Sequence, residues 1–379
     1  MGDRFSVRYR VFATDLAEAR ARAEDIALEQ TVEIPRDVVP AGYIEDVVLG
    51  RVEDVAGEGN GTFVAWISYS PDTVGHELPQ LLNVIFGNSS IQKGLKVVGF
   101  DPGPVLPQRF AGARFGAVGL RALTGRKSGG FVCPVIKPQG STAAWLARIC
   151  YATARAGADI VKEDHGLANQ PAAPLRERIP RLAEAVARAN AERAALGDPT
   201  RALYFPNIGG HGDQVHDDAM FAKESGADGV LLIPGLYGFD AMNRLARDPE
   251  FGLPVMAHPA HLGPYVLSAD TGYSHAMMFG TLMRLAGADI SVFPNHGGRF
   301  GFSAAECQQI VAACADPAGY GRAILPSPGG GMTLDRLPDM MRLYGPDCVY
   351  LLGGSLLRYG DRIGDAVAAM RAALDAPAG

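Results

Sequence analysis

The best candidates for chemistry in this chain lie in residues 159–166, DIVKEDHG, where an apolar stretch ends in a lysine, an acid and a histidine. If the stretch is a β-strand, residues two apart point to the same side, so Lys162 and Asp164 share one face and His165 begins the turn. Lysine is scarce, with six among 35 basic residues, which favours a functional role for Lys162. A structural ion pair with Asp164, or a lysine amine that only reaches the rim, would produce the same pattern.

The position of these residues in the fold helps to separate the two interpretations. From residue 131 onward, eight short apolar runs alternate with eight helical patterns, which is typical of parallel strands covered by helices. The predicted strands are 131–138, 159–166, 202–210, 229–235, 254–261, 289–296, 322–331 and 347–354. The predicted helices are 142–156, 174–196, 217–225, 239–247, 274–286, 303–315, 334–344 and 364–374. We therefore predict an α/β fold whose catalytic domain, residues 126–379, is a (β/α)8 TIM barrel.

A Gly-Ala-Asp motif precedes three of these strands, at residues 157–159, 226–228 and 287–289. Glycine commonly ends a helix, so we expect the motif to be structural.

Residues 1–125 show shorter alternations of apolar and polar residues around one helical stretch at 15–28. The predicted strands of this part are 5–12, 44–55, 62–70, 78–86 and 95–100. This pattern indicates a small N-terminal α+β (ferredoxin-like) domain with an antiparallel sheet.

Active sites of such barrels lie at the carboxyl ends of the strands. The polar residues expected there are Lys137, Lys162, Asp164, His165, Asn207, His211, His258, His261, Asn295 and His296, which include five of the eight histidines. The last two strands end instead in glycines, Gly329, Gly330, Gly331, Gly353 and Gly354. Backbone N–H groups in such loops commonly bind phosphate, so we expect a phosphorylated substrate.

Composition narrows the class of partner and compartment. A net charge of −6 without a block of like charges disfavours a nucleic-acid or membrane-surface partner. There is no apolar stretch of about 18 residues and no signal peptide, and the five cysteines form no CxxC pair. We expect a cytoplasmic enzyme with reduced thiols.

In their order and spacing, these motifs resemble the ribulose-bisphosphate carboxylase superfamily, and within it the RuBisCO-like proteins (form IV). The resemblance spans nearly the whole chain. The matching segments are 58–63 (EGNGTF), 86–88 (FGN), 135–138 (VIKP), 157–164 (GADIVKED), His258, 296–298 (HGG), 329–331 (GGG) and 353–354 (GG).

The resemblance implies roles for individual residues. Lys162 would react with CO2 to form a carbamate, which would bind Mg²⁺ together with Asp164 and His165. Lys137 would transfer the substrate proton, and His258 would join the catalytic residues. His296 and the glycine loops would bind substrate and phosphate. The resemblance also implies that Glu58, Thr62 and Asn88 reach the barrel mouth of a partner subunit, in a homodimer or a multiple of dimers.

Several positions depart from the carboxylases. His165 replaces a second acid. Because hard cations prefer oxygen ligands, His165 would either ligate a softer metal, bind Mg²⁺ less tightly or hydrogen-bond the substrate instead, and the metal identity stays open. Gln139 and Pro259 replace a lysine and an arginine, which indicates one phosphate rather than two. Residues 295–303 contain Arg299 but no lysine. Net CO2 fixation is therefore disfavoured.

The preferred function is metal-assisted enolisation and isomerisation of a phosphorylated keto-sugar, such as 5-methylthioribulose 1-phosphate. Within the family, the alternative is a decarboxylase or transcarboxylase/hydrolase acting on a phosphorylated 3-keto sugar acid. Outside it, Lys137 or Lys162 would serve as the nucleophile of a Schiff-base aldolase, or the chain would be a non-catalytic binding protein.

Overall fold

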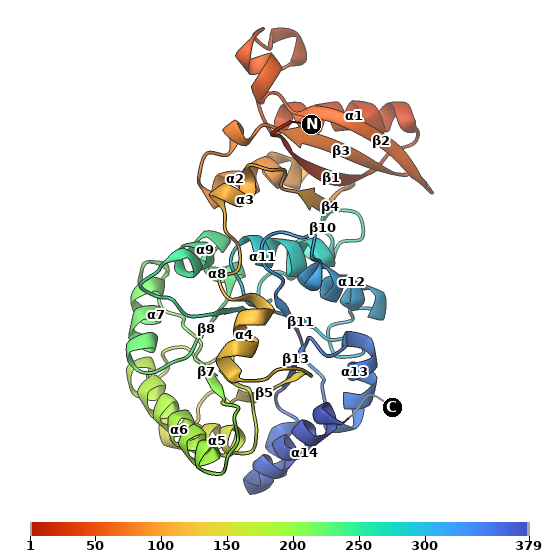
Figure 1. Ribbon diagram of the computed structural model, residues 1–379. Coiled ribbons are helices and arrows are strands. Elements are labelled where there is room, and N and C mark those ends of the chain that lie inside the picture. The colour runs from red at the N-terminus through yellow and green to blue at the C-terminus, as the bar shows by residue number, and fades with distance from the viewer. Residues whose placement is uncertain (1, 377–379) are drawn as a thin grey trace.

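Eight short, almost entirely buried strands form the barrel of the computed structural model, which describes residues 2–376 (Figure 1). Burial on both faces is expected for parallel strands with helices on the outside. The barrel strands are β5 (Phe131–Ile136), β6 (Ile160–Glu163), β7 (Leu203–Phe205), β8 (Val230–Leu232), β9 (Val255–Ala257), β11 (Ile290–Pro294), β12 (Leu325–Gly329) and β13 (Val349–Leu352).

The helices around the barrel mostly match their predicted ranges. They are α5 (Ala143–Arg155), α6 (Leu175–Ala195), η5 (Gly212–Gln214), α7 (Val215–Glu224), α8 (Pro234–Tyr237), α9 (Phe239–Arg247), α10 (Gly263–Val266), η6 (Met277–Leu282), α11 (Met283–Leu285), α12 (Ala304–Ala315), η7 (Leu334–Arg336), α13 (Leu337–Tyr344), η8 (Leu356–Arg362) and α14 (Ile363–Asp375). The helix expected over 274–286 is largely the π-helix η6. There Gly280 lies so close to Ala313 of α12 that a side chain would collide.

The barrel closes differently at its two joins. Backbone pairing runs through β13-β5-β6-β7 and through β8-β9-β11-β12. A parallel bridge between Asn207 and Leu231 connects β7 to β8. Among the described residues, no ladder connects β12 to β13.

Two prolines explain the open join between β12 and β13. Leu325 donates its N–H toward the β11 side, so the N–H positions of residues 326 and 328 face β13. Both residues are proline, which has no N–H to donate. Ser327 compensates in part, because its Oγ donates a hydrogen bond to the Val349 carbonyl over 3.0 Å. Backbone hydrogen bonds of a ladder therefore do not join the ends of these two strands where the glycine loops begin.

The Gly-Ala-Asp motifs tie neighbouring strands together through their aspartates. The carboxylates of Asp159, Asp228 and Asp289 accept hydrogen bonds from N–H groups in the preceding strands β5, β7 and β9, over 2.7, 3.0 and 3.0 Å. Burial raises the pKa of Asp289 to about 6. This pairing is the physical basis of the structural role predicted for the motif.

A five-stranded sheet forms the N-terminal part, at the top of Figure 1, in the order β10-β4-β1-β3-β2. The pairs among β1, β2, β3 and β4 are antiparallel, as predicted, whereas β10 belongs to the barrel part of the sequence and pairs in parallel with β4. The strands are β1 (Phe5–Phe12), β2 (Arg51–Gly59), β3 (Thr62–Tyr69), β4 (Leu95–Asp101) and β10 (Gly272–Tyr273). The helices that precede the barrel strands in the sequence are α1 (Leu16–Glu29), η1 (Arg36–Val38), η2 (Ile44–Val48), η3 (Pro71–Thr73), α2 (Leu78–Phe86), η4 (Asn88–Ile91), α3 (Leu106–Arg109) and α4 (Gly116–Thr124), of which α4 lies against the barrel (Figure 1).

One predicted strand in this part was wrong, and another was predicted to begin too early. Residues 78–86 form helix α2, which buries Leu78, Leu81, Val84 and Ile85 at helical spacing. Because the run is almost continuously apolar, its sequence does not distinguish the two periods. The start of the strand predicted over 44–55 is the π-helical turn η2, and β2 begins only at Arg51.

Helix α4 covers the end of the barrel at which the strands begin, opposite the cavity. Its Leu120 packs with the side chains that fill the barrel interior, among them Phe131 and Leu203. A domain boundary at residue 125 stays a prediction, and it would separate α4 from the barrel that it covers.

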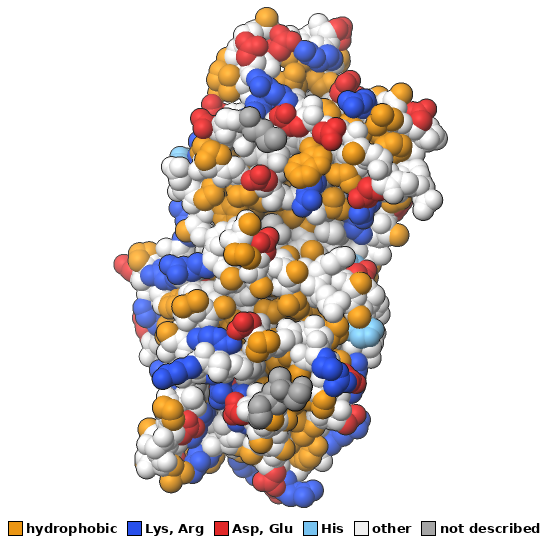
Figure 2. All heavy atoms as spheres, turned by 45° about the vertical axis from the view of Figure 1, so that its right-hand side comes forward, with side chains coloured by type: hydrophobic (Ala, Val, Ile, Leu, Met, Phe, Trp, Pro, Cys, Tyr) orange, Lys and Arg blue, Asp and Glu red, His pale blue; other side chains and the backbone are white. Residues whose placement is uncertain are grey.

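Basic and acidic side chains are interspersed over the face of the molecule shown in Figure 2. None of the helices among residues 2–376 is long and apolar enough to cross a membrane.

Candidate active site

The inward-facing positions of the barrel strands continue directly into a cavity of about 660 Å³. On β5, Cys133 and Val135 belong to the interior core, and Lys137 is the next residue on that side. On β9, Met256 fills the interior and His258 follows it into the cavity. The strand period therefore places polar side chains at the carboxyl end of the barrel.

Charged residues meet at the ends of β5 and β6. The Nζ of Lys137 lies 2.5 Å from Oδ2 of Asp164, and the Gly166 N–H donates to Oδ1 over 3.0 Å. Burial alone would raise the pKa of Asp164, but these two bonds hold it below its usual value. Lys162 is 2% exposed and donates to the Glu163 carbonyl over 2.9 Å. Burial lowers the pKa of Lys162 to about 8, which makes neutral amine available near physiological pH.

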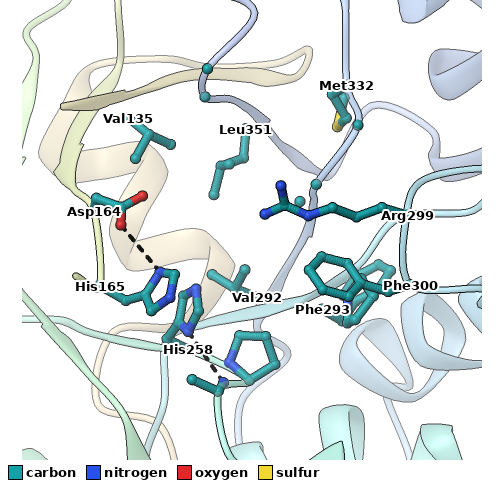
Figure 3. A pocket seen from close by; sticks show the side chains of 18 of the residues that line it. Val135, Asp164, His165, His258, Val292, Phe293, Arg299, Phe300, Met332 and Leu351 are labelled. Atoms are coloured by element: carbon teal, nitrogen blue, oxygen red, sulfur yellow. Dashed lines mark hydrogen bonds and ion pairs between the residues drawn. The ribbon is translucent and has the colours of Figure 1, made fainter. Parts of the chain in front are cut away.

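Two histidines stack beside this charged cluster (Figure 3). The rings of His165 and His258 are 4.1 Å apart, and Nδ1 of His165 lies 3.4 Å from Oδ1 of Asp164. Burial lowers the pKa of both imidazoles, and that of His258 falls well below its usual value. The Ala260 N–H donates to Nδ1 of His258 over 3.2 Å. The neutral His258 ring therefore carries its proton on Nε2.

The donor set fits a divalent cation once Lys162 is modified. Asp164 and His165 offer two ligand atoms, and among residues 2–376 no three His, Cys, Asp or Glu side chains are grouped to hold a metal ion. A carbamate on Lys162 would add an oxygen ligand of the kind that Mg²⁺ prefers. The neutral amine that reacts with CO2 is the form favoured by the lowered pKa of Lys162. Lys162, Asp164 and His165 are thus chemically suited to hold the ion.

The glycine loops line the side of the cavity formed by β12 and β13. Gly330 and Gly331 have φ angles of +85° and +78°, which side chains rarely tolerate. Gly353 and Gly354 follow β13, and a Cβ on Gly354 would meet no atom within 4 Å. Exposed backbone N–H groups in such loops suit an anion.

Apolar side chains and two arginines complete the cavity. Arg299 extends into it beside Phe300, with Met332 nearby (Figure 3). The apolar part is formed by Val266, Leu267, Phe279, Phe293, Phe300, Phe302 and Met332. Arg358 follows the second glycine loop and also lines the cavity, although it was not among the residues predicted from the sequence. Its position four residues after Gly354, in the loop of a predicted anion site, was the available signal.

Most of the predicted site residues come together, but several do not. Lys137, Lys162, Asp164, His165, His258 and all five glycines line the cavity, as does His261. His296 does not line it, and its Nδ1 lies 3.3 Å from the Phe302 carbonyl. His211 is also outside the lining.

The three residues predicted to act in a partner subunit lie in the N-terminal part and outside the cavity of this chain. Glu58 pairs with Arg10 over 2.9 Å, and Thr62 begins β3. Asn88 donates to Glu29 and Glu33 over 2.9 and 3.1 Å. Their action in a partner subunit stays a prediction.

Comparison with known proteins identifies relatives of this chain in sequence and in fold. Residues 117–301 match the family model of the ribulose bisphosphate carboxylase large chain, catalytic domain. The chain is 38% identical to the 5-methylthioribulose-1-phosphate isomerase of Rhodospirillum rubrum, covering 99% of this chain and 97% of that protein. It is 30% identical to a 2,3-diketo-5-methylthiopentyl-1-phosphate enolase of Microcystis aeruginosa, covering 82% and 77%. The crystal structure of a Rubisco-like protein from Rhodopseudomonas palustris superimposes with a TM-score of 0.85 at 34% identity, covering 99% and 98%.

Proposed function

Because the chain belongs to the ribulose bisphosphate carboxylase large-chain family, among its RuBisCO-like proteins, we propose that it enolises and isomerises a phosphorylated keto-sugar. The leading candidate substrate is 5-methylthioribulose 1-phosphate, the substrate named for the relative from Rhodospirillum rubrum. One observation carries this proposal: a single cavity combines acid-base groups, glycine loops and an apolar wall. These parts suit, in turn, the carbons that exchange a proton, the phosphate and the methylthio group.

Lys137 is the group proposed to transfer the proton through its Nζ. In the structure this amine forms an ion pair with Asp164 over 2.5 Å, so it is not free to act as a base. It must release Asp164 and pass a proton to solvent water before it accepts one from substrate carbon. A base next to the reacting carbon is worth about 10²–10⁴-fold in rate.

His258 is proposed to orient the substrate. With Nδ1 accepting from Ala260, its Nε2–H is the donor available to a substrate oxygen. Its lowered pKa keeps the ring neutral, so it donates a hydrogen bond without adding a positive charge beside Lys162. Such a donor steadies negative charge on the oxygen as the neighbouring carbon loses its proton.

Three side chains are proposed to hold Mg²⁺. They are the carbamate of Lys162, the carboxylate of Asp164 and the imidazole of His165. When bound, the ion supplies Lewis-acid polarisation of the substrate carbonyl. His165 is neutral, as a metal ligand must be, because burial lowers its pKa.

Two observations count against net CO2 fixation within this proposal. The loop after β11 brings Arg299 into the cavity and contains no lysine. The residue directly after His258 is Pro259, which has no cationic group for a second phosphate. The apolar wall instead suits a thioether group at the far end of the substrate.

The test is to incubate the protein with each candidate substrate in the presence of Mg²⁺ and bicarbonate and to monitor the reaction by ³¹P NMR. The proposal predicts conversion of 5-methylthioribulose 1-phosphate to an isomer of the same mass. Turnover of 2,3-diketo-5-methylthiopentyl 1-phosphate alone would move the assignment to the enolase reaction. Release of CO2 from a phosphorylated 3-keto sugar acid, without isomerisation of either compound, would replace enolisation by carbon–carbon cleavage.

The assembly proposed with this function is a homodimer in which Glu58, Thr62 and Asn88 reach the partner's cavity. A mixture of Asn88→Ala and Lys162→Ala chains would test it. In a random mixture half the dimers are mixed, and each mixed dimer has one intact site of two, so activity should return to about a quarter of the wild-type value. No return, with subunit exchange demonstrated by mass, would mean that each site is built from one chain.

A further inference from the structure

The turn that carries Asp164 and His165 is held from behind by buried side chains that do not line the cavity. Glu163 lies between Lys162 and Asp164 but makes its contacts on the outside of the barrel. Its carboxylate pairs with Arg178 of α6 over 2.8 Å, and neither side chain is exposed. The Tyr204 hydroxyl donates to the same carboxylate over 2.7 Å.

Arg178 holds the far part of this loop through backbone carbonyls. Its NH1 group donates to the carbonyls of Ala168 and Ala173 over 2.6 and 2.7 Å. One buried guanidinium therefore binds both Glu163 and the segment that leads from the turn into α6.

Asn207, at the end of β7, holds the near part of the loop. Its Nδ2 donates to the carbonyls of His165 and Leu167 over 3.2 and 2.8 Å. Its backbone N–H donates to Glu163 over 3.0 Å. Asn207 is 1% exposed, and its Oδ1 has no hydrogen-bond partner among the described residues.

Stability alone is a poor explanation for this arrangement. A buried ion pair such as Glu163 with Arg178 commonly contributes no more than well-packed apolar residues would. A buried acceptor without a partner, such as Oδ1 of Asn207, costs free energy. What these groups have in common is that they fix the backbone on either side of His165.

We propose that Glu163, Arg178 and Asn207 are positioning residues, which hold the turn so that Asp164 and His165 face the cavity before any ligand arrives. The proposal rests on the proposed function only in assigning Asp164 and His165 to the reaction. Support of metal ligands by groups behind them is commonly worth 10–100-fold in affinity or activity.

The test is Asn207→Asp, which keeps the size and shape of the side chain but replaces the NH2 donor by an acceptor. The matched control is Asn190→Asp on α6. Asn190 also donates its Nδ2 to a backbone carbonyl, that of Ala202, over 2.9 Å, at the start of β7 and away from the cavity. If Asn207→Asp does not fold, Asn207→Ala removes the donor without adding charge.

Three measurements are made on the full chain, each at a temperature that lies the same number of degrees below the Tm of the variant. Amide hydrogen exchange follows residues 164–174, Mn²⁺ titration with bicarbonate follows metal affinity, and kcat and KM follow turnover of 5-methylthioribulose 1-phosphate. For Asn207→Asp we expect faster exchange in this segment, metal affinity and kcat lower by about 10–100-fold, and KM nearly unchanged. Asn190→Asp should leave all of these at wild-type values.

Equal behaviour of the two variants in metal affinity and kcat would overturn the proposal, even if the loop exchanges faster in one of them. Exchange and metal affinity need no substrate. If both change as expected while the wild type fails to turn over the keto-sugar, the positioning role stands and the proposed function is wrong.

Discussion

The end of β6 and the ends of β12 and β13 face the same cavity, but the first lines it with charged side chains and the other two line it with glycine backbone. At β6 charged side chains line the cavity: Asp164 forms an ion pair with Lys137, and Lys162 donates a hydrogen bond to the Glu163 carbonyl. At β12 and β13, glycine backbone lines the cavity, and prolines keep the two strands from pairing. Under the proposed function, this difference predicts that one side of the cavity governs turnover and the other governs substrate binding. Changes at β6 should lower kcat, whereas changes at the glycine loops should raise KM.

The largest effect is expected from Lys162→Met. This variant keeps the buried aliphatic stem but cannot form a carbamate, so the oxygen ligand supplied by residue 162 is lost. Because Lewis-acid stabilisation is worth several kcal/mol, kcat should fall by more than about 10³-fold. Mn²⁺ binding, followed by electron paramagnetic resonance with bicarbonate, should be lost as well. Wild-type turnover in Lys162→Met would rule out the carbamate.

Lys137→Met separates the proton-transfer group from the metal site on the same side of the cavity. The loss of the base should lower kcat by about 10²–10⁴-fold. Metal affinity should be kept or strengthened, because Asp164 no longer has Lys137 at 2.5 Å. Steady-state kinetics and Mn²⁺ titration measure the two effects, and weakened metal binding with normal kcat would reverse the assigned roles.

The glycine side is tested by Gly354→Val. A Cβ on Gly354 would meet no atom within 4 Å, so the fold should be unaffected. A bulky side chain there would occupy the space proposed for the phosphate. Loss of charge-assisted hydrogen bonds costs about 1.5–3 kcal/mol, so KM should rise by about 10–100-fold with kcat nearly unchanged.

Gly330→Val is the companion variant, in which the positive φ of Gly330 adds backbone strain. Its Tm should therefore fall, whereas that of Gly354→Val should not. A drop in kcat at unchanged KM in Gly354→Val would break the division between the two sides.

A smaller effect is expected in the pH dependence of activation. Since burial lowers the pKa of Lys162 to about 8, the neutral amine rises from about a tenth at pH 7 to about nine tenths at pH 9. At constant dissolved CO2, the rate of activation should therefore increase about tenfold over this range. A flat profile would mean that Lys162 is not the residue that reacts.

The same shift has a consequence for stability. The folded-state pKa of Lys162 lies below the ordinary lysine value of 10.5, so the unfolded chain binds more protons between pH 8 and 10.5. The contribution of Lys162 to the free energy of unfolding should rise with pH in that window. Urea unfolding of the wild type and of Lys162→Met across this pH range measures the contribution of Lys162 as the difference between their free energies of unfolding.

Much of the barrel could be predicted because its signals are local. Each strand is a short apolar run, and the alternation along β5 and β6 places Lys137, Lys162 and Asp164 correctly. Residues 78–86 were assigned wrongly because a continuous apolar run has no clear period. His296 was expected at the cavity from its strand, but side-chain direction in the following loop depends on its contacts.

Other parts of the site could not be predicted, because they depend on contacts between distant residues. Glu163 and Arg178 are 15 positions apart, and Asn207 reaches the His165 carbonyl from 42 positions away. Nothing in the local sequence of Asn207 indicates that its amide fixes that turn. Likewise, the effect of Pro326 and Pro328 on β13 follows only from the order of strands in the barrel.

The most direct test of enolisation is ¹H NMR of 5-methylthioribulose 1-phosphate in D2O with the protein, Mg²⁺ and bicarbonate, beside Lys137→Met. We predict that the proton on the carbon next to the carbonyl is replaced by deuterium with the wild type and is retained with Lys137→Met. Retention with the wild type, while metal binding is demonstrated and no isomer forms, would contradict the proposed function.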